Sequence, residues 1–152
     1  MALEKEQIPQ YVNAAPLLIL STVDAANAPA TRVLASFASD DGYVVYFSTG
    51  RSSEKVGQIA GNPSVSALFQ HDGQPIGAFR NVEIRGVAVP LADGAEREKA
   101  IRLISARNPR FKERAEKGQL GENALYRVTP KAVKVIDFTK GVGPAAVTSF
   151  TP

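Results

Sequence analysis

The sequence predicts a mainly β protein in which six or seven antiparallel strands close into a small barrel, with a few short helices. Three observations support this fold class. Apolar and polar residues alternate over several short segments, turn-forming residues separate neighbouring segments, and few stretches have helical spacing. At 152 residues the chain has the length of one domain and can bury about two-thirds of its unfolded surface. We therefore expect a single domain over residues 1–152.

The first half of the chain is expected to contain one helix and three strands. The helix falls within residues 1–14, and the apolar segment PLLILSTV, which begins at Pro16, is typical of a buried strand. The turn DAANAP connects this strand to TRVLASFAS, so the two should form a hairpin. A turn at Asp40-Asp41-Gly42 leads to the strand YVVYFS, and we expect Gly42 to take the left-handed conformation there.

The second half combines two helical regions with the remaining strands. The segment SSEKVGQIAGNP predicts a helix that begins at its serines and stops at Gly61-Asn62-Pro63. The segments SVSALFQ and FRNVEIRGVAVPL alternate as strands do. Residues 95–118 are helical in pattern with a break at Asn108-Pro109, and ALYRVTPKAVKVIDF predicts two strands hinged at Thr129-Pro130. Residues 140–152 are expected to form a flexible C-terminal tail.

Composition excludes several classes of function. The chain has no cysteine, which rules out disulfides, thiolate metal sites and a cysteine nucleophile and makes the cytoplasm the expected location. A net charge of +3 without a basic stripe argues against nucleic acid as a partner. The longest apolar run, 14–20, is too short to span a membrane. His71 is the only histidine, and no carboxylates lie at an informative spacing, so we assign neither a catalytic residue nor a metal site.

A candidate phosphate site lies between the second strand and the first internal helix. Arg32 shares a strand face with aliphatic and hydroxyl side chains, and a guanidinium in such a place needs an anion. Ser53 and Lys55 open a helix whose N-terminal amides can bind phosphate. Each residue also has an ordinary alternative: Arg32 could pair with a carboxylate across the sheet, Ser53 could cap the helix, and Lys55 could be a solvated surface lysine.

The ordered set of motifs resembles the FMN-binding split-barrel family related to pyridoxamine 5'-phosphate oxidase. The strand TRVL, the spacing to the strand end YFST, the run SEK followed by GQIAGNPSVSALF, and FRNVEIRGVAVPL all occur in the family's order. The resemblance implies that the flavin phosphate, the flavin ring and the ribityl chain are held by Arg32, Val33, Leu34, Phe47, Ser48, Thr49, Ser53, Lys55 and Asn81. Arg32, Ser53 and Lys55 would hold the phosphate, and Asn81 would reach a flavin edge from a second subunit.

The resemblance implies an FMN-dependent oxidoreductase that acts on a small molecule as a homodimer, with the flavin at the subunit interface. Two departures bear on this expectation, because Phe37 stands where the oxidase has a lysine and Glu54 where it has an arginine. The chain also shows no counterpart of the oxidase's C-terminal Arg and His, so oxidation of pyridoxamine phosphate is not expected. The alternatives are a split barrel that binds deazaflavin, one that binds heme through His71, and a non-catalytic flavin-binding stress-response module.

Overall fold

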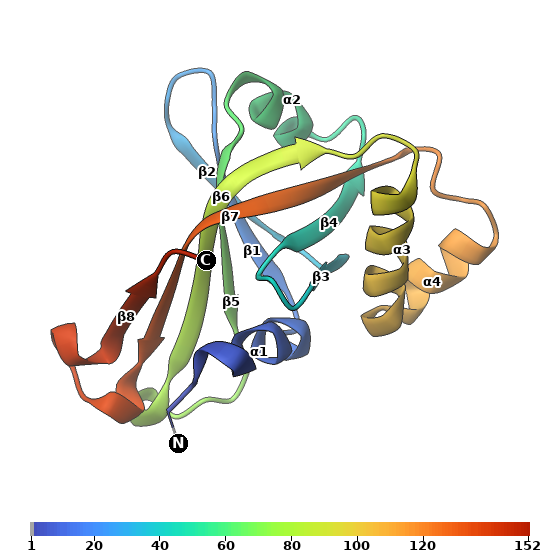
Figure 1. Ribbon diagram of the computed structural model, residues 1–152. Coiled ribbons are helices and arrows are strands. Elements are labelled where there is room, and N and C mark those ends of the chain that lie inside the picture. Colours follow the sequence, from blue (N-terminus) through green and yellow to red (C-terminus); the bar gives the residue numbers. More distant parts are fainter. Residues whose placement is uncertain (1) are drawn as a thin grey trace.

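Eight antiparallel strands form one sheet that curls into a split barrel in the computed structural model, which describes residues 2–152 (Figure 1). The strands are β1 (Leu18–Val23), β2 (Pro29–Leu34), β3 (Phe37–Ser39), β4 (Val45–Gly50), β5 (Ser64–Gln70), β6 (Arg80–Pro90), β7 (Asn123–Asp137) and β8 (Val147–Phe150). The α-helices are α1 (Ile8–Ala14), α2 (Glu54–Gly61), α3 (Ala95–Arg107) and α4 (Pro109–Glu116). The predicted fold class is confirmed.

The sheet closes because its two ends are consecutive pieces of the chain. Its strand order is β2-β1-β5-β6-β7-β4-β3, with β8 added beside β7. Only Ala35 and Ser36 separate β2 from β3, and the Ser48 amide of β4 donates to the Ser36 carbonyl at 2.9 Å. The segment predicted as one strand, TRVLASFAS, is therefore broken in two, and each piece pairs with a different neighbour.

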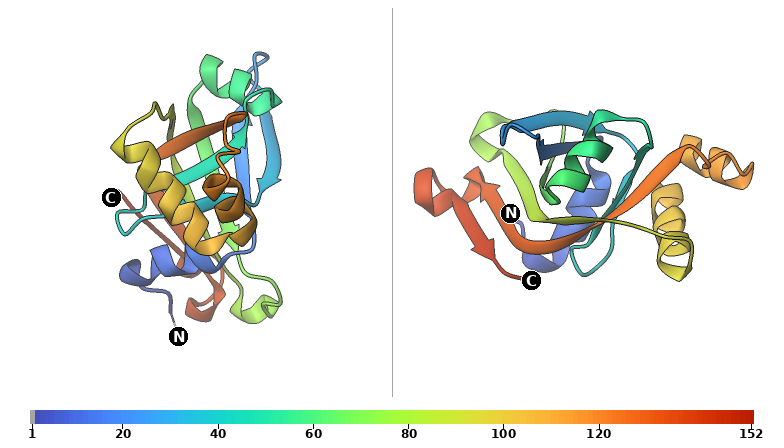
Figure 2. Two further views of the ribbon diagram at one scale, coloured as in Figure 1. Left: turned by 90° about the vertical axis from the view of Figure 1, so that its right-hand side faces the viewer. Right: turned by 90° about the horizontal axis from the view of Figure 1, so that it is seen from above.

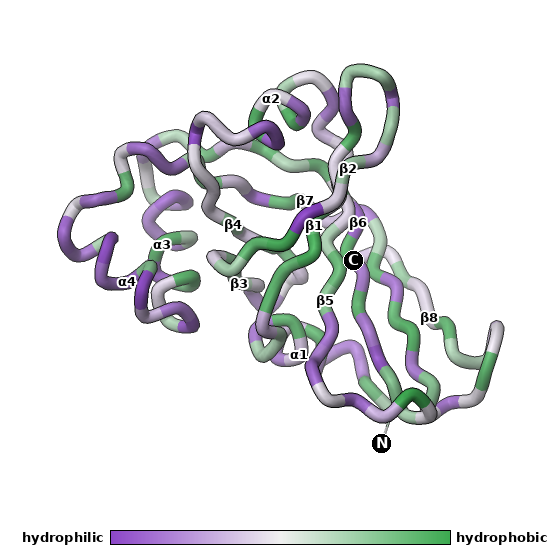
Figure 3. The backbone as a smooth tube through the Cα atoms, turned by 180° about the vertical axis from the view of Figure 1, so that it is seen from behind, coloured by the Kyte–Doolittle hydropathy of each residue, from purple (hydrophilic) through white to green (hydrophobic). Residues whose placement is uncertain are grey.

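Two apolar cores lie on opposite sides of the curled sheet. The larger one fills the barrel, and α1 and α2 contribute to it from opposite ends (Figures 1 and 2). The smaller one lies between the α3–α4 pair and the outer side of β3, β4 and β7, where Ile104 and Phe111 pack on Tyr46. Hydropathy along the backbone agrees with this division, since β1 is mainly hydrophobic and α4 mainly hydrophilic (Figure 3).

Among residues 2–152, no helix combines the length and the apolar character needed to cross a membrane.

The turn between β3 and β4 differs from the prediction. Tyr43, and not Gly42, has the left-handed backbone, with φ of 67°. The cause is the side chain of Asp40, whose Oδ1 accepts the backbone amides of Gly42 at 2.8 Å and Val44 at 3.1 Å. This local pair of hydrogen bonds fixes the turn and moves the strained position one residue along the chain.

The predicted hinge at Thr129-Pro130 is also wrong, because β7 is one continuous strand of 15 residues. Its pairing with β6 shifts register between Arg85 and Gly86, and this bulge accommodates Pro130, which has no amide to donate. The backbones approach so closely that a Cβ on Gly86 would lie 2.0 Å from the Thr129 carbonyl oxygen. Glycine is required at this position.

The C-terminal residues form ordered structure in the region predicted to be a tail. A 3-10 turn over Gly143–Ala146 leads into β8, which pairs with residues 133–136 of β7. The break between α3 and α4 is where the sequence predicts it, and Asn108 caps α4 by accepting the Phe111 amide at 3.1 Å.

Arg107, the last residue of α3, holds the broken β2–β3 segment in place. Its guanidinium donates to the carbonyls of Asn13 at 3.1 Å, Ala15 at 2.7 Å, Ala35 at 3.1 Å and Phe37 at 3.1 Å. The same group lies 3.7 Å from the centre of the Phe37 ring. Burial lowers the pKa of Arg107, and its charge is balanced by carbonyl dipoles rather than by a carboxylate.

Asp137, at the end of β7, ties the N-terminal segment to the sheet. Its buried carboxylate accepts the amides of Leu3 and Thr139, both at 3.0 Å, and the Thr139 hydroxyl at 2.5 Å. Arg80 lies 3.4 Å away as its ion-pair partner. Burial alone would raise the pKa of Asp137, but the hydrogen bonds and the Arg80 charge outweigh it and lower the pKa.

We expect Arg107→Met to lower the free energy of unfolding by about 2 to 4 kcal/mol, since it leaves four backbone carbonyls without their charged donor. Chemical denaturation measures this change. Arg102→Met is the matched control, because Arg102 is an exposed residue of the same helix. Equal stability of the two variants would show that the guanidinium does not hold the β2–β3 segment.

Asp137→Asn should make the protein less stable at neutral pH by about 2 kcal/mol, because it removes a hydrogen-bonded charge. The pKa of Asp137 is lower in the folded state than its unfolded value of about 3.9. The stabilisation by its carboxylate is therefore complete at pH values above about 3.9 and is lost as the pH falls through the lowered pKa. The stability difference from wild type should therefore shrink in acid. A pH series of denaturation curves tests this, with the exposed Asp72→Asn as control; a constant difference would contradict it.

Candidate functional site

A cluster of cationic and hydroxyl side chains lies where β4 ends and α2 begins. Ser53 is the N-cap residue of α2, with extended backbone at φ −69° and ψ 150°, yet its hydroxyl caps no helix amide. That hydroxyl lies 3.3 Å from Thr49 Oγ1, and Lys55 Nζ donates to the same Thr49 oxygen at 2.9 Å. The ordinary capping role predicted as the alternative for Ser53 is therefore absent.

Arg32 reaches this region from β2 by crossing over β1. Its guanidinium donates to the Leu20 carbonyl at 3.3 Å, to Thr22 Oγ1 at 2.8 Å and to Gln58 Oε1 at 2.9 Å. Antiparallel pairing places Arg32 opposite Leu20 of β1. From there its side chain reaches Gln58, in the second turn of α2. The residue is half-buried, which is less than the sequence predicts.

Neither cation of the cluster is neutralised by a carboxylate. Within residues 2–152, no ion pair involves Arg32 or Lys55. Burial lowers the pKa of Lys55, and the Arg32 charge lowers it further. Burial also lowers the pKa of Arg32, with Glu54 acting in the opposite direction. Two mutually repelling, partly desolvated cations favour an anion between them.

The start of α2 adds backbone donors to the cluster. The Ser53 amide donates to the Gly50 carbonyl and the Val56 amide to the Ser53 carbonyl. In the described part of the chain, the amides of Glu54 and Lys55 have no hydrogen-bond partner. These two amides and the positive end of the helix dipole are suited to an anion.

The other residues predicted near the cofactor occupy different environments. Val33 is 56% exposed, whereas Leu34, on the opposite face of β2, packs against the barrel core. Phe47 lies inside the core, stacked on Tyr126 with ring centres 5.0 Å apart. The Ser48 hydroxyl is buried and accepts from Asn123 Nδ2 at 2.9 Å. None of these four side chains forms a hydrogen bond with Arg32, Ser53 or Lys55 within residues 2–152.

Asn81 is not brought to the cluster within one chain. It lies on β6, opposite Gln70 of β5 and Ile136 of β7, so β1 and β5 separate it from β2. Asn81 therefore shares no strand pair with the residues of the cluster.

Two residues of the network escaped the sequence analysis. Thr22, a buried residue of β1, donates to Gln58 Oε1 at 2.6 Å, and Gln58 Nε2 donates to Glu54 Oε1 at 2.9 Å. Gln58 thus links the two charged groups, because it accepts from the Arg32 guanidinium and donates to the Glu54 carboxylate. The Glu54–Gln58 spacing of four residues could have indicated a shared helix face, but nothing in the sequence places Thr22 beside them.

The only histidine is engaged in local structure. His71 stacks on Tyr11 with ring centres 3.8 Å apart, and its Nε2 lies 2.8 Å from the Tyr11 carbonyl oxygen. Because a carbonyl only accepts, Nε2 must carry the proton in this contact. Residues 2–152 also contain no group of three or more acidic or histidine side chains able to hold a metal ion.

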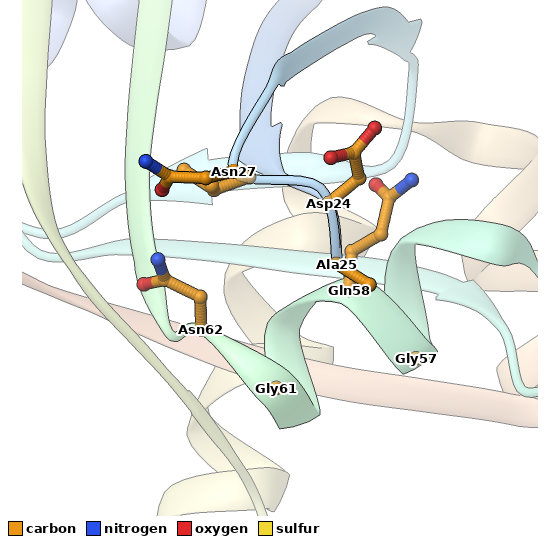
Figure 4. Close-up of a pocket in the computed structure, with 8 residues that line it drawn as sticks. Asp24, Ala25, Asn27, Gly57, Gln58, Gly61 and Asn62 are labelled. Atoms are coloured by element: carbon orange, nitrogen blue, oxygen red, sulfur yellow. The ribbon is translucent and has the colours of Figure 1, made fainter.

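Two cavities lie against α2. One, of about 650 Å³, has a mainly apolar lining formed by Arg51, Val56, Ile59, Ala60, Pro63, Ala88, Pro90, Ala124 and Tyr126. The other, of about 410 Å³, lies beside the β1–β2 turn, and its polar groups come from Asp24, Asn27, Gln58 and Asn62 (Figure 4). Arg51 and Val56 line the first cavity and Gln58 lines the second, so both cavities lie next to residues that flank the cationic cluster.

The curled antiparallel sheet defines a split-barrel protein. The family model of pyridoxamine 5'-phosphate oxidase matches residues 4–137, so the chain belongs to this family. A search of curated proteins gives no match.

Solved structures share the fold at low sequence identity. A conserved hypothetical protein from Mycobacterium tuberculosis superposes with a TM-score of 0.75 and 19% identity, covering 91% of this chain and 87% of the other. The heme storage protein HutZ from Vibrio cholerae gives 0.68 and 21%, covering 86% and 91%. General Stress Protein 26 from Bacillus anthracis gives 0.65 and 24%, covering 86% and 92%.

Inorganic phosphate should stabilise the protein more than chloride does at equal ionic strength, because it would neutralise Arg32 and Lys55. We expect a gain of about 1 kcal/mol in the free energy of unfolding at about five times the phosphate Kd. The gain should disappear in Lys55→Ala and persist in Lys112→Ala, an exposed lysine of α4. Identical stability in the two salts would contradict an anion site.

Proposed function

We propose that the protein is a flavoprotein that binds FMN, with the flavin phosphate held between Arg32 and Lys55. The observation that carries this proposal is the pair of partly buried cations without a carboxylate partner. A phosphate monoester carries close to two negative charges at neutral pH, which matches two cations. The Thr49 and Ser53 hydroxyls and the amides that open α2 would complete the set of donors.

Neither departure from the oxidase pattern places a carboxylate in an ion pair with Arg32 or Lys55 within residues 2–152. Phe37 is fully buried beneath the Arg107 guanidinium, so it contributes packing and no charge. Glu54 is exposed and forms no ion pair with Arg32 within residues 2–152, although its charge acts to raise the Arg32 pKa. The phosphate would therefore be held by two cations of this chain, and either one should contribute strongly to binding.

The rest of the cofactor would lie along strands β2 and β4, on either side of the β2–β3 break. In this proposal the backbone at Val33 and Leu34, with that at Phe47 and Ser48, borders the flavin ring and ribityl chain. Asn81 would come from a second subunit, because its strand lies apart from the cluster in one chain. The assembly would then be a homodimer with two flavin sites at its interface.

Bound FMN would supply hydride or electron transfer, and the protein would bind, orient and shield it for a small-molecule substrate. No side chain is assigned a proton-transfer role. His71 Nε2 is bonded to the Tyr11 carbonyl, and the apolar cavity beside α2 has no carboxylate in its lining. Substrate choice would depend on the shape of the space around the cofactor.

Heme is the main competing cofactor, because HutZ shares the fold. His71 is the only histidine that could bind the iron, and two contacts oppose this role: its stacking on Tyr11 and its Nε2 bond to a carbonyl. A deazaflavin with a phosphate group could use the same cradle as FMN. A non-catalytic stress-response module would also retain flavin, but without turnover.

Arg32→Ala and Lys55→Ala should each weaken FMN binding by about 1.5 to 3 kcal/mol, which is the range for losing a hydrogen bond to a charged group. Quenching of flavin fluorescence during titration measures the affinity. Riboflavin, which lacks the phosphate, should bind the wild type much more weakly than FMN and should not distinguish it from the two variants.

Arg110→Ala provides the control, since Arg110 is exposed on α4, away from the cluster. Unchanged FMN affinity in both Arg32→Ala and Lys55→Ala would rule out the cradle. A heme spectrum that is lost in His71→Ala, without any flavin binding, would instead favour the heme-binding alternative.

A further inference from the structure

The apolar cavity beside α2 is a candidate for a second ligand site. It lies between α2 and the adjoining ends of β6 and β7 (Figure 1). Its volume of about 650 Å³ is within the usual range of ligand pockets. None of the residues of the cationic cluster lines it, so a ligand in this cavity would be separate from the phosphate proposed to lie between Arg32 and Lys55.

The cavity has a buried floor and an exposed mouth. Ile59, Ala88 and Tyr126 are buried, whereas Arg51 and Ala60 are exposed. Apart from Arg51 and Tyr126, the lining consists of aliphatic residues, namely Val56, Ile59, Ala60, Pro63, Ala88, Pro90 and Ala124. An apolar chain or ring that enters the cavity would therefore be removed from water, which favours its binding.

Tyr126, at the floor of the cavity, has a hydroxyl group without a partner. The residue is 4% exposed, and within residues 2–152 its hydroxyl forms no hydrogen bond. The two other buried tyrosines, Tyr11 and Tyr46, donate to oxygen atoms of the chain at 2.7 Å and 3.2 Å. Buried tyrosine hydroxyls usually have such a partner. The Tyr126 hydroxyl therefore points to a ligand that carries a hydrogen-bond acceptor.

Arg51 adds one positive charge at the mouth of the cavity. Its Nε donates to the Gly121 carbonyl at 2.9 Å, and in the described part of the chain Nη1 and Nη2 have no hydrogen-bond partner. Two acidic residues, Asp93 and Glu98, line a neighbouring cavity that Arg51 also borders. Asp93 pairs with Arg97 at 3.8 Å, and within residues 2–152 neither acidic residue forms an ion pair with Arg51. The two Nη groups can thus bind both oxygens of a carboxylate.

The Tyr126 hydroxyl and the Arg51 guanidinium are close enough to affect each other. Burial raises the pKa of Tyr126, and the charge of Arg51 acts in the opposite direction. Both groups are hydrogen-bond donors, and no carboxylate lines the cavity with them. One cation and one hydroxyl suit a ligand with a single negative charge, in contrast to the two cations of the cluster at the start of α2.

We propose that this cavity binds an amphipathic monocarboxylate, which is a molecule with one carboxylate group on an apolar chain or ring. The carboxylate binds Arg51 and accepts a hydrogen bond from the Tyr126 hydroxyl. The apolar part fills the space between α2 and the ends of β6 and β7. This site goes beyond the proposed function, because it does not depend on whether the protein binds flavin.

Calorimetric titrations with octanoate, 1-octanol and acetate at neutral pH test the proposal. Octanoate has both the charge and the apolar chain, octanol has only the chain, and acetate has only the charge. We expect octanoate to bind one site per chain at least about tenfold more tightly than octanol, because it gains hydrogen bonds between charged groups. Acetate should show no saturable binding, since it has almost no apolar surface to bury.

Substitutions in the lining separate the contributions of charge, hydroxyl and space. Arg51→Gln should remove the advantage of octanoate over octanol, and Tyr126→Phe, which keeps the ring, should weaken octanoate binding about fivefold. Ala60→Phe should prevent both ligands from binding by filling the mouth, and its exposed position on α2 tolerates a larger side chain. The matched controls are Arg110→Gln and Ala106→Phe, at exposed positions of α4 and α3.

The absence of saturable octanoate binding, or equal affinities for octanoate and octanol in the wild type, would overturn the proposal. Octanoate binding that survives in Ala60→Phe would overturn the choice of cavity. The titrations are repeated with saturating FMN, and displacement of FMN by octanoate would make the cavity part of the flavin site and overturn the proposal. A protein that binds octanoate as expected but no FMN would support this site while the proposed function fails.

Discussion

The barrel depends on how the Arg107 guanidinium holds the chain between β2 and β3. Strand β2 pairs with β1, whereas β3, which follows it directly, pairs with β4. At the break between them, the Arg107 guanidinium donates hydrogen bonds to the carbonyls of Ala35 and Phe37. The same group anchors the end of α1, so helix and sheet share one donor. Without this closure, Arg32 on β2 would not be held beside the β4–α2 connection, and the two cations would not converge.

Local pattern predicts most of the fold. Alternation identifies β5 and β6, and an asparagine before a proline identifies the break between α3 and α4 because Asn108 caps the second helix. The failures all involve interactions that the local pattern does not contain. Asp40 fixes a turn through its side chain and so places Tyr43, not Gly42, in the left-handed conformation. Pro130 stays within a strand because the chain opposite forms a bulge at Gly86.

The candidate site also contains some residues that the sequence indicates and others that only the folded structure brings together. Arg32, Ser53 and Lys55 could be found from the sequence because one lies mid-strand among aliphatic residues and the others open a helix. Thr22 and Gln58 could not, since their roles arise only where β1, β2 and α2 meet. The result is a site in which neither Arg32 nor Lys55 forms an ion pair within residues 2–152, so an anionic ligand between the two cations would reduce their repulsion.

The pKa of Lys55 tests this central claim most directly. An NMR titration of isotope-labelled lysine side chains, with the Lys55 signal assigned by its loss in Lys55→Arg, gives the value with and without FMN. Burial and the Arg32 charge predict a pKa below the ordinary lysine value in the free protein, and neutralisation by the flavin phosphate predicts a rise when FMN is bound. A Lys55 pKa that is ordinary in the free protein and unchanged by saturating FMN would contradict the assignment of this cluster as the phosphate site.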